Sequence, residues 1–304
     1  MSESTLENTL SQYLLDTASC IYNGESMHHP IIVANALKNI LGDVRSNPSK
    51  TILNFLDQHN QSYNKRSKDN IYLKNIDKKE IGLTVFISDL EDACQNGDIV
   101  NTQKHLSRIY LASDGSPVIL QNLAELALQD IKEYGTFIYH CLRAFAFAPE
   151  KERVWIFLQC IIQTLFNKRL PIPHPNVNID ELDINKYFLN SNDSKELNTL
   201  SAAWRLLESE YTRLPGFKRE ISFWANQCNT VKQIDIKEKN PENLNYYLDN
   251  QNDYFVKLAE DIIQSDEDII ERIITLESLR YFTKKINIDY LPVIAFKIHL
   301  LMDN

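Results

Sequence analysis

The sequence predicts an all-α fold, either an irregular multi-helix bundle or a short, degenerate α-solenoid of roughly a dozen helices. Apolar residues recur three and four positions apart after almost every break in the chain, which is the period of a helix with one buried face. Only 7 glycines occur in 304 residues, whereas sandwiches and nucleotide-binding sheets need glycine at many turns and phosphate loops. The signatures of tetratricopeptide and ankyrin repeats do not occur.

Three helices are expected in the first sixty residues. The first spans 4–21 and starts with a capping-box pattern, in which a hydroxyl and a carboxylate satisfy free amides of the first turn. The second spans 30–41, with Pro30 suited to its first position and Gly42 ending it. A third helix follows over 48–59.

The next part of the chain is polar before helical periodicity returns. Residues 61–79 are rich in lysine but lack regularly interleaved aromatic residues, so they indicate a solvated surface loop rather than a nucleic-acid patch. A helix is expected over 80–95, and Asp98 can cap the helix that follows it.

The most densely apolar part of the chain is 103–170, and we expect the rest to be organised around it. Breaks at 114–117, Gly135 and Pro149 divide this part into helices with broad apolar faces. His140 lies in the most buried of these helices, the one that follows Gly135.

Residues 171–192 are expected to form an extended, proline-containing connector. The connector separates an N-terminal helical core, 1–170, from a C-terminal helical part, 193–304, which we expect to pack on the first as one globular unit. In the C-terminal part, 231–236 alternates like a short strand and 241–264 has the period of one long helix. Further helices are expected over 193–209, 217–228, 265–284 and 287–302.

Composition limits the compartment and the partners. The formal net charge of −9 makes nucleic acid an unlikely partner, because affinity for phosphates comes largely from Lys and Arg. Five cysteines without a CxxC pair show no zinc or disulfide framework and fit a reducing compartment. The first residues lack a signal-peptide pattern and the longest apolar run is too short to span a bilayer. A cytoplasmic protein with no membrane association is therefore expected.

No nucleotide loop, nucleophile elbow or HExxH motif occurs. The histidines are therefore the residues to consider as catalytic candidates. His28 and His29 precede a helix start, and His140 lies on an apolar face. Converging histidines could act as acid and base near neutral pH, whereas single ones are more often loop or buried structural residues. The spacing of Glu25 and His28 occurs only once and lies between a glycine and a proline, so no metal site is expected.

Two segments carry a resemblance to a known family. The run from His28 and His29 through Leu37 resembles the histidine-containing helix start of questin-oxidase-like proteins, and 135–144, with His140, is similar to their histidine-containing apolar helix. The resemblance implies an all-helical enzyme that oxidises aromatic polyketides, with His28, His29 and His140 as catalytic candidates and a small hydrophobic or aromatic ligand. It specifies no cofactor.

Two functions of different classes remain open at this stage. An oxidase-like enzyme requires that His140 and one of His28 or His29 face a common pocket. A non-catalytic helical module, which binds a protein partner or forms a homo-oligomer, requires a contiguous apolar patch or groove.

Overall fold

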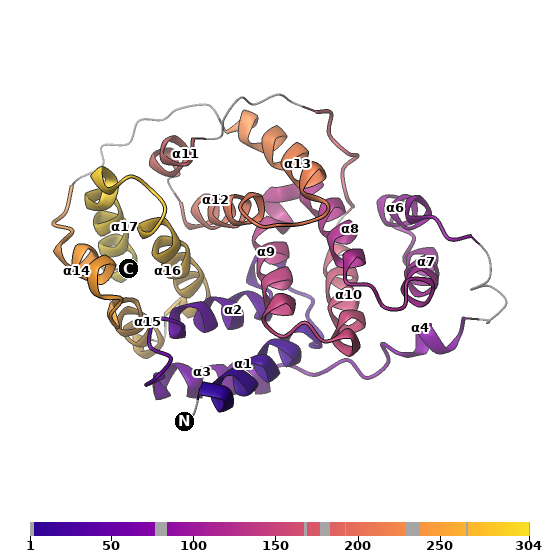
Figure 1. The fold of residues 1–304 in the computed structure, drawn as a ribbon, viewed down its shortest axis with the longest axis horizontal. Helices are drawn as coiled ribbons and strands as arrows, with labels where there is room; N and C mark the ends of the chain where they lie inside the picture. Colours follow the sequence, from indigo (N-terminus) through magenta and orange to yellow (C-terminus); the bar gives the residue numbers. More distant parts are fainter. Residues whose placement is uncertain are drawn as a thin grey trace.

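The chain is all-α, as the sequence predicts, in a computed structural model that describes residues 3–76, 84–166, 169–176, 183–191, 193–228, 238–265 and 267–303 (Figure 1). No strand occurs among these residues, although Cys20 and Lys65 form an isolated antiparallel bridge. The α-helices of the first half are α1 (Glu3–Ala18), α2 (Pro30–Leu41), α3 (Lys50–Gln61), α4 (Ile71–Lys74), α6 (Ile87–Gln95), α7 (Ile99–Ala112), α8 (Val118–Ala127), α9 (Ile131–Phe147) and α10 (Lys151–Leu165).

The second half continues with helices of similar length. They are α11 (Ile184–Asn190), α12 (Ser194–Leu207), α13 (Leu214–Gln227), α14 (Glu242–Asn250), α15 (Tyr254–Ser265), α16 (Ile269–Thr283) and α17 (Leu291–Asp303). Short 3₁₀ helices, η1 (Ser26–His28), η2 (Leu128–Asp130) and η3 (Ile288–Tyr290), precede α2, α9 and α17.

The helices form an irregular bundle rather than a solenoid. Helix α9 lies at the centre and packs against α2 and α12, while α16 also packs against α2 and α12 (Figure 1). These partners are far apart in the sequence, whereas the repeats of a solenoid contact only their neighbours. One continuous hydrophobic core runs from Leu6 to Ile298, so both halves of the chain contribute to it. The proposed domain boundaries themselves stay a prediction.

Local signals explain where the central helices begin. Helix α2 starts at Pro30, the His29 imidazole accepts a hydrogen bond from the Ile31 amide, and Gly42 follows its last residue, as expected from the sequence. Helix α9 starts after Asp130, whose carboxylate accepts from the amide of Glu133.

Gly135 does not break the chain, contrary to the sequence-based expectation. It lies inside α9, where a β-carbon would come within 2.7 Å of Cγ1 of Ile131. The residue therefore permits close packing inside the helix. The helix expected over 241–264 is also divided, because Gln251 adopts φ 44° and ends α14 before α15 begins.

Helix α11 lies inside the range expected to be an extended connector. Asp183 caps it, and Phe188 anchors it in the core. Between α10 and α11 the described non-helical residues are Phe166, 169–176 and Asp183. The strand expected over 231–236 lies outside the described residues, as do residues 80–83 of the helix expected over 80–95. Residues 84–86 are described and are not helical, so α6 starts later than expected, at Ile87. Among the described helices, none combines the length and the apolar character needed to cross a membrane.

Candidate anion-binding site

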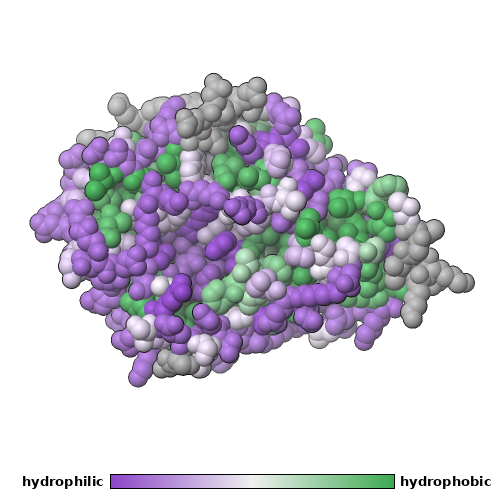
Figure 2. Space-filling view, viewed as in Figure 1, coloured by the Kyte–Doolittle hydropathy of each residue, from purple (hydrophilic) through white to green (hydrophobic). Residues whose placement is uncertain are grey.

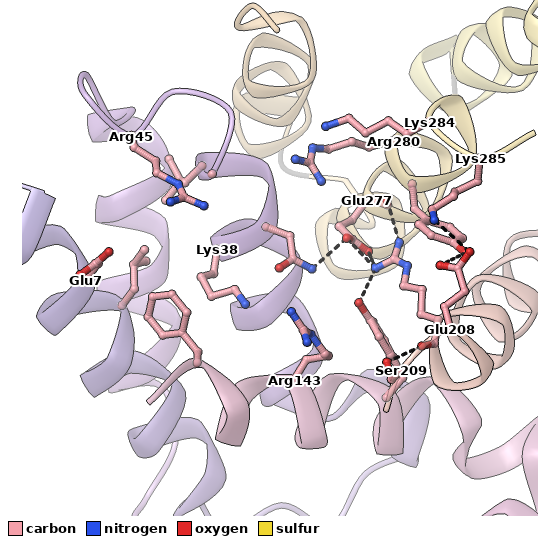
Figure 3. A pocket seen from close by; sticks show the side chains of 18 of the residues that line it. Glu7, Lys38, Arg45, Arg143, Glu208, Ser209, Glu277, Arg280, Lys284 and Lys285 are labelled. Atoms are coloured by element: carbon pink, nitrogen blue, oxygen red, sulfur yellow. Dashed lines mark hydrogen bonds and ion pairs between the residues drawn. The ribbon is translucent and has the colours of Figure 1, made fainter. Parts of the chain in front are cut away.

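A pocket of about 550 Å³ lies between α1, α2, α9, α12 and α16, in the region where the central helices meet (Figure 3). Viewed from the same side as Figure 1, the surface over α2, α12 and α16 is predominantly hydrophilic (Figure 2). Basic side chains dominate the lining of the pocket: Lys38, Arg45, Arg143, Arg205, Arg280, Lys284 and Lys285. Its acidic side chains are Glu7, Glu208 and Glu277, and Leu6, Leu10, Leu41 and Phe147 give it an apolar wall.

Four of the basic side chains have acidic partners. Arg205 pairs with Glu277 at 2.7 Å, and Lys285 pairs with Glu208 at 2.9 Å. Arg280 and Lys284 share Asp43, which lies just after α2. These pairs neutralise one side of the pocket.

Three basic side chains, Lys38, Arg45 and Arg143, have no acidic partner in the part of the chain that the structure describes. They come from α2, from the turn after α2 and from α9 (Figure 3). Because the chain as a whole carries a net charge of −9, this local excess of positive charge is opposite in sign to that of the molecule. Such an arrangement attracts anions, and arginine can hold a carboxylate or phosphate through two parallel hydrogen bonds.

Lys38 is the most deeply placed of the three, with only 8% of its surface exposed. Its ammonium group lies 4.9 Å from the centre of the Phe147 ring. Burial, together with the positive charge of Arg143, lowers the pKa of Lys38 to about 7, even though Glu277 opposes the shift. This amine is therefore partly neutral near pH 7.

The Arg205–Glu277 pair forms the inner wall beside Lys38. Nη1 of Arg205 donates to both carboxylate oxygens of Glu277 and also to the Tyr139 hydroxyl at 2.9 Å. Burial alone would raise the pKa of Glu277, but the Arg205 guanidinium, together with weaker effects of His140 and Arg280, brings the value down to about 2. Asn39 donates a further hydrogen bond at 2.9 Å. Glu277 is thus ionised, and both of its carboxylate oxygens accept hydrogen bonds.

His140 lies behind the pocket wall, between α9 and α2. It is 2% exposed, and its Nδ1 is 2.8 Å from Nδ2 of Asn35. Burial lowers the pKa of His140 to about 3, so the ring is neutral near pH 7. It is not among the residues that line the described pockets.

His29 and His28 have other surroundings. Nε2 of His29 lies 3.7 Å from Sγ of Cys160, and its ring packs against Phe137. The His28 side chain is 40% exposed and lies 3.8 Å from the Glu25 carboxylate. The structure brings His29 and His140 to the same α2–α9 interface, but to different partners. The catalytic role of the three histidines stays a prediction.

The sequence-based reasoning did not identify the basic pocket residues. The available signal was Lys38 itself, which is the one charged residue in the sequence of α2. Arg143 and Arg205 gave no comparable signal, because isolated arginines on amphipathic helices are common. Among the described residues, no group of three or more His, Cys, Asp or Glu side chains has the geometry to hold a metal ion. Comparisons with protein-family models, curated proteins and solved structures gave no match.

Proposed function

We propose that the protein binds a small organic anion in the pocket between α2, α9 and α16. The observation that carries the proposal is the excess of positive side chains in a chain of net charge −9, with Lys38, Arg45 and Arg143 left without an acidic partner among the described residues. A bound acid group would supply the missing counter-charge.

The pocket also favours a particular kind of anion. Its volume of about 550 Å³ falls in the range of small-molecule sites, which is roughly 300–1,000 Å³. Leu6, Leu10 and Leu41 form an apolar wall on the α1 side, so a ligand with an apolar or aromatic body would bury that body there. The proposal therefore adds an acid group to the small hydrophobic or aromatic ligand expected from the sequence.

A pair of fluorescent probes tests the proposal. Anilinonaphthalene sulfonate carries the required acid group, and N-phenyl-1-naphthylamine has the same aromatic body without it. We expect the sulfonate to bind with a single saturable site. Arg143→Gln should weaken it by at least about tenfold, since a hydrogen bond to a charged group contributes roughly 1.5–3 kcal/mol. The uncharged probe should be affected much less.

Lys218→Gln provides the matched control, because it also removes one positive charge, from an exposed site on α13 outside the pocket. It should leave the affinity for the sulfonate within about twofold of the wild type, since surface charges far from a site are screened by salt. Equal affinity of the wild type for both probes, or equal effects of the two substitutions, would overturn the proposal.

The two functions considered from the sequence, an oxidase-like enzyme and an interaction module, do not depend on this anion site. The oxidase-like activity rests on the resemblance alone and stays a prediction. A binding module would require an apolar surface, and Phe86, Ile99 and Val100 are exposed around α6 and α7. No finding tests whether a partner binds these residues, so the interaction module also stays a prediction.

A further inference from the structure

Lys38 has surroundings that are unusual for a lysine. Lysine side chains are almost never buried without a partner, because removing an ammonium group from water is costly. Lys38 is 8% exposed and lines the pocket, yet no hydrogen bond or ion pair to an acidic group holds it within the described residues. The Glu277 carboxylate, which lines the same pocket, is already bound to Arg205 and Asn39.

Burial and, to a smaller extent, the surrounding charged groups favour the neutral form of Lys38. Arg143 on α9, Arg205 on α12 and Arg280 on α16 oppose its ammonium charge, and only Glu277 on α16 supports it. A lysine that is desolvated beside other cations is the arrangement that makes an amine nucleophilic near neutral pH. The adjoining pocket leaves room for a ligand at the amine, and Figure 3 shows the Lys38 side chain directed toward the same space as that of Arg143.

We propose that Lys38 forms a Schiff base with the carbonyl carbon of a small oxo acid bound in this pocket. The inference rests on the proposed anion binding, because the Arg143 and Arg45 side chains would hold the acid group while the carbonyl group meets the amine. The ligand class is therefore an organic acid with a ketone or aldehyde group, preferably on an apolar or aromatic body.

The chemical step balances without an oxidant or a reductant. The nitrogen lone pair of Lys38 forms a bond to the carbonyl carbon, and the carbonyl π electrons move to oxygen, which takes up a proton as nitrogen loses one. The carbinolamine then loses its hydroxyl group with a proton as water, and a carbon–nitrogen double bond remains. The amine and the carbonyl compound thus give one imine and one water molecule, and hydrolysis reverses the step.

Reductive trapping in the full-length protein tests the inference. The protein is incubated at pH 7 with phenylpyruvate and cyanoborohydride, whose hydride converts the imine to a stable secondary amine. We expect the mass of the protein to increase by that of one ligand minus one oxygen atom, and peptide mapping should place the adduct on Lys38. Because the pKa of Lys38 is about 7 and that of an ordinary lysine 10.5, its neutral fraction is larger by about three orders of magnitude. Labelling at Lys38 should therefore exceed that at Lys218 by at least about tenfold.

Phenyllactate provides the matched competitor, since it has the same acid group and ring but a hydroxyl group in place of the carbonyl. An excess of phenyllactate should suppress the adduct at Lys38 and leave the weak labelling of surface lysines unchanged. Lys38→Met, which replaces the amine by an uncharged, unbranched side chain one atom shorter, should abolish the adduct. Its circular dichroism checks that the variant keeps the helical fold.

The outcomes separate this inference from the proposed function. If phenylpyruvate binds by calorimetry but gives no adduct on Lys38, the Schiff base is overturned and the anion site stands. If neither phenylpyruvate nor phenyllactate binds and no adduct forms, both proposals fail. Labelling spread evenly over the lysines, or labelling of Lys38 that phenyllactate does not reduce, also overturns the inference.

Discussion

The Glu277 carboxylate accepts two hydrogen bonds from one nitrogen of Arg205, at 2.7 and 2.8 Å, and both side chains are buried. This contact joins α16 to α12, and the hydrogen bond from Asn39 extends it to α2. Because Arg205 also donates to the Tyr139 hydroxyl of α9, the pair links all four of the helices α2, α9, α12 and α16 and at the same time forms the inner wall of the pocket. Because Glu277 is engaged in this pair, it opposes the lowering of the Lys38 pKa without forming an ion pair with Lys38.

Replacing Glu277 by glutamine should strongly destabilise the fold. Glutamine keeps the shape of the side chain but leaves the buried Arg205 guanidinium without its counter-charge. Breaking a buried ion pair from one side costs roughly 3–5 kcal/mol in the free energy of unfolding. Urea unfolding followed by circular dichroism measures this loss.

Glu208→Gln is the control for this substitution, since its pair with Lys285 lines the same pocket but is solvent-exposed. It should cost no more than about 1 kcal/mol, the usual upper value for a surface ion pair. A Glu277→Gln protein as stable as the Glu208→Gln protein would show that the buried pair does not hold the helices together.

Lys38→Met should change how the stability of the protein depends on pH. The pKa of Lys38 is about 7 in the folded chain, against an ordinary value of 10.5. Between these values the unfolded chain binds more protons, so the contribution of Lys38 to stability is fully present above pH 10.5 and is lost as the pH falls to 7. The stability of the wild type relative to Lys38→Met should therefore rise by about 2 kcal/mol from pH 7 to pH 9.

The measurement is urea unfolding of both proteins at several pH values. Taking the difference between them cancels the titration of the tyrosines and cysteines that both contain. Lys218→Met serves as the control for the loss of one exposed positive charge. A constant difference between the wild type and Lys38→Met over this range would show that Lys38 keeps its proton when the chain folds.

The sequence predicted the fold class because most helices carry their own boundaries. Pro30 and Gly42 bracket α2, and the three- and four-residue spacing of apolar side chains identifies the buried faces. The pocket was not predictable in the same way. Lys38, Arg143 and Arg205 come from three helices, and only tertiary packing brings them to one cavity. Whether these basic side chains can bind a ligand depends on which of them are paired with acidic groups in the folded protein. The order of residues in the sequence does not show these pairs.

The prediction of a break at Gly135 failed for a specific physical reason. Glycine often ends helices because it tolerates left-handed backbone conformations. At position 135 it serves another purpose, because the neighbouring side chain leaves no room for a β-carbon. A β-carbon would lie 2.7 Å from Cγ1 of Ile131, one turn earlier in α9. The sequence cannot distinguish these two uses of glycine, because both place it next to apolar residues.

Gly135→Ala should therefore destabilise the protein, although alanine is the better helix former. The gain in helix propensity is about 1 kcal/mol, whereas overpacking a buried site costs roughly 1–3 kcal/mol. We expect a net loss of up to about 2 kcal/mol in urea unfolding. If the side chain of Ile131 causes the loss, Gly135→Ala should cost nothing in an Ile131→Ala background. An increase in stability in the wild-type background would contradict the steric explanation.

His140 should stay neutral over the whole range in which ordinary histidines titrate. Burial lowers its pKa to about 3, and Nδ2 of Asn35 donates to Nδ1 at 2.8 Å, so the proton must be on Nε2. In ¹⁵N-labelled protein, the ring nitrogens of His140 should show the Nε2-protonated neutral form and keep constant shifts from pH 7.5 to pH 5. The signals are assigned by their loss in His140→Gln.

The same shift makes His140 a source of acid sensitivity. Its pKa is about 3 in the folded chain and 6.5 ordinarily, so the unfolded chain binds more protons between these values. Its contribution to stability is fully present above pH 6.5 and is lost as the pH falls toward 3. His59, with a pKa lowered by burial to about 4, adds to this loss. The free energy of unfolding should therefore fall less steeply between pH 6.5 and pH 5 in His140→Gln than in the wild type. Parallel slopes, or ring shifts that move toward the imidazolium form above pH 5, would mean that His140 can take up a proton inside the fold, as an acid–base role would require.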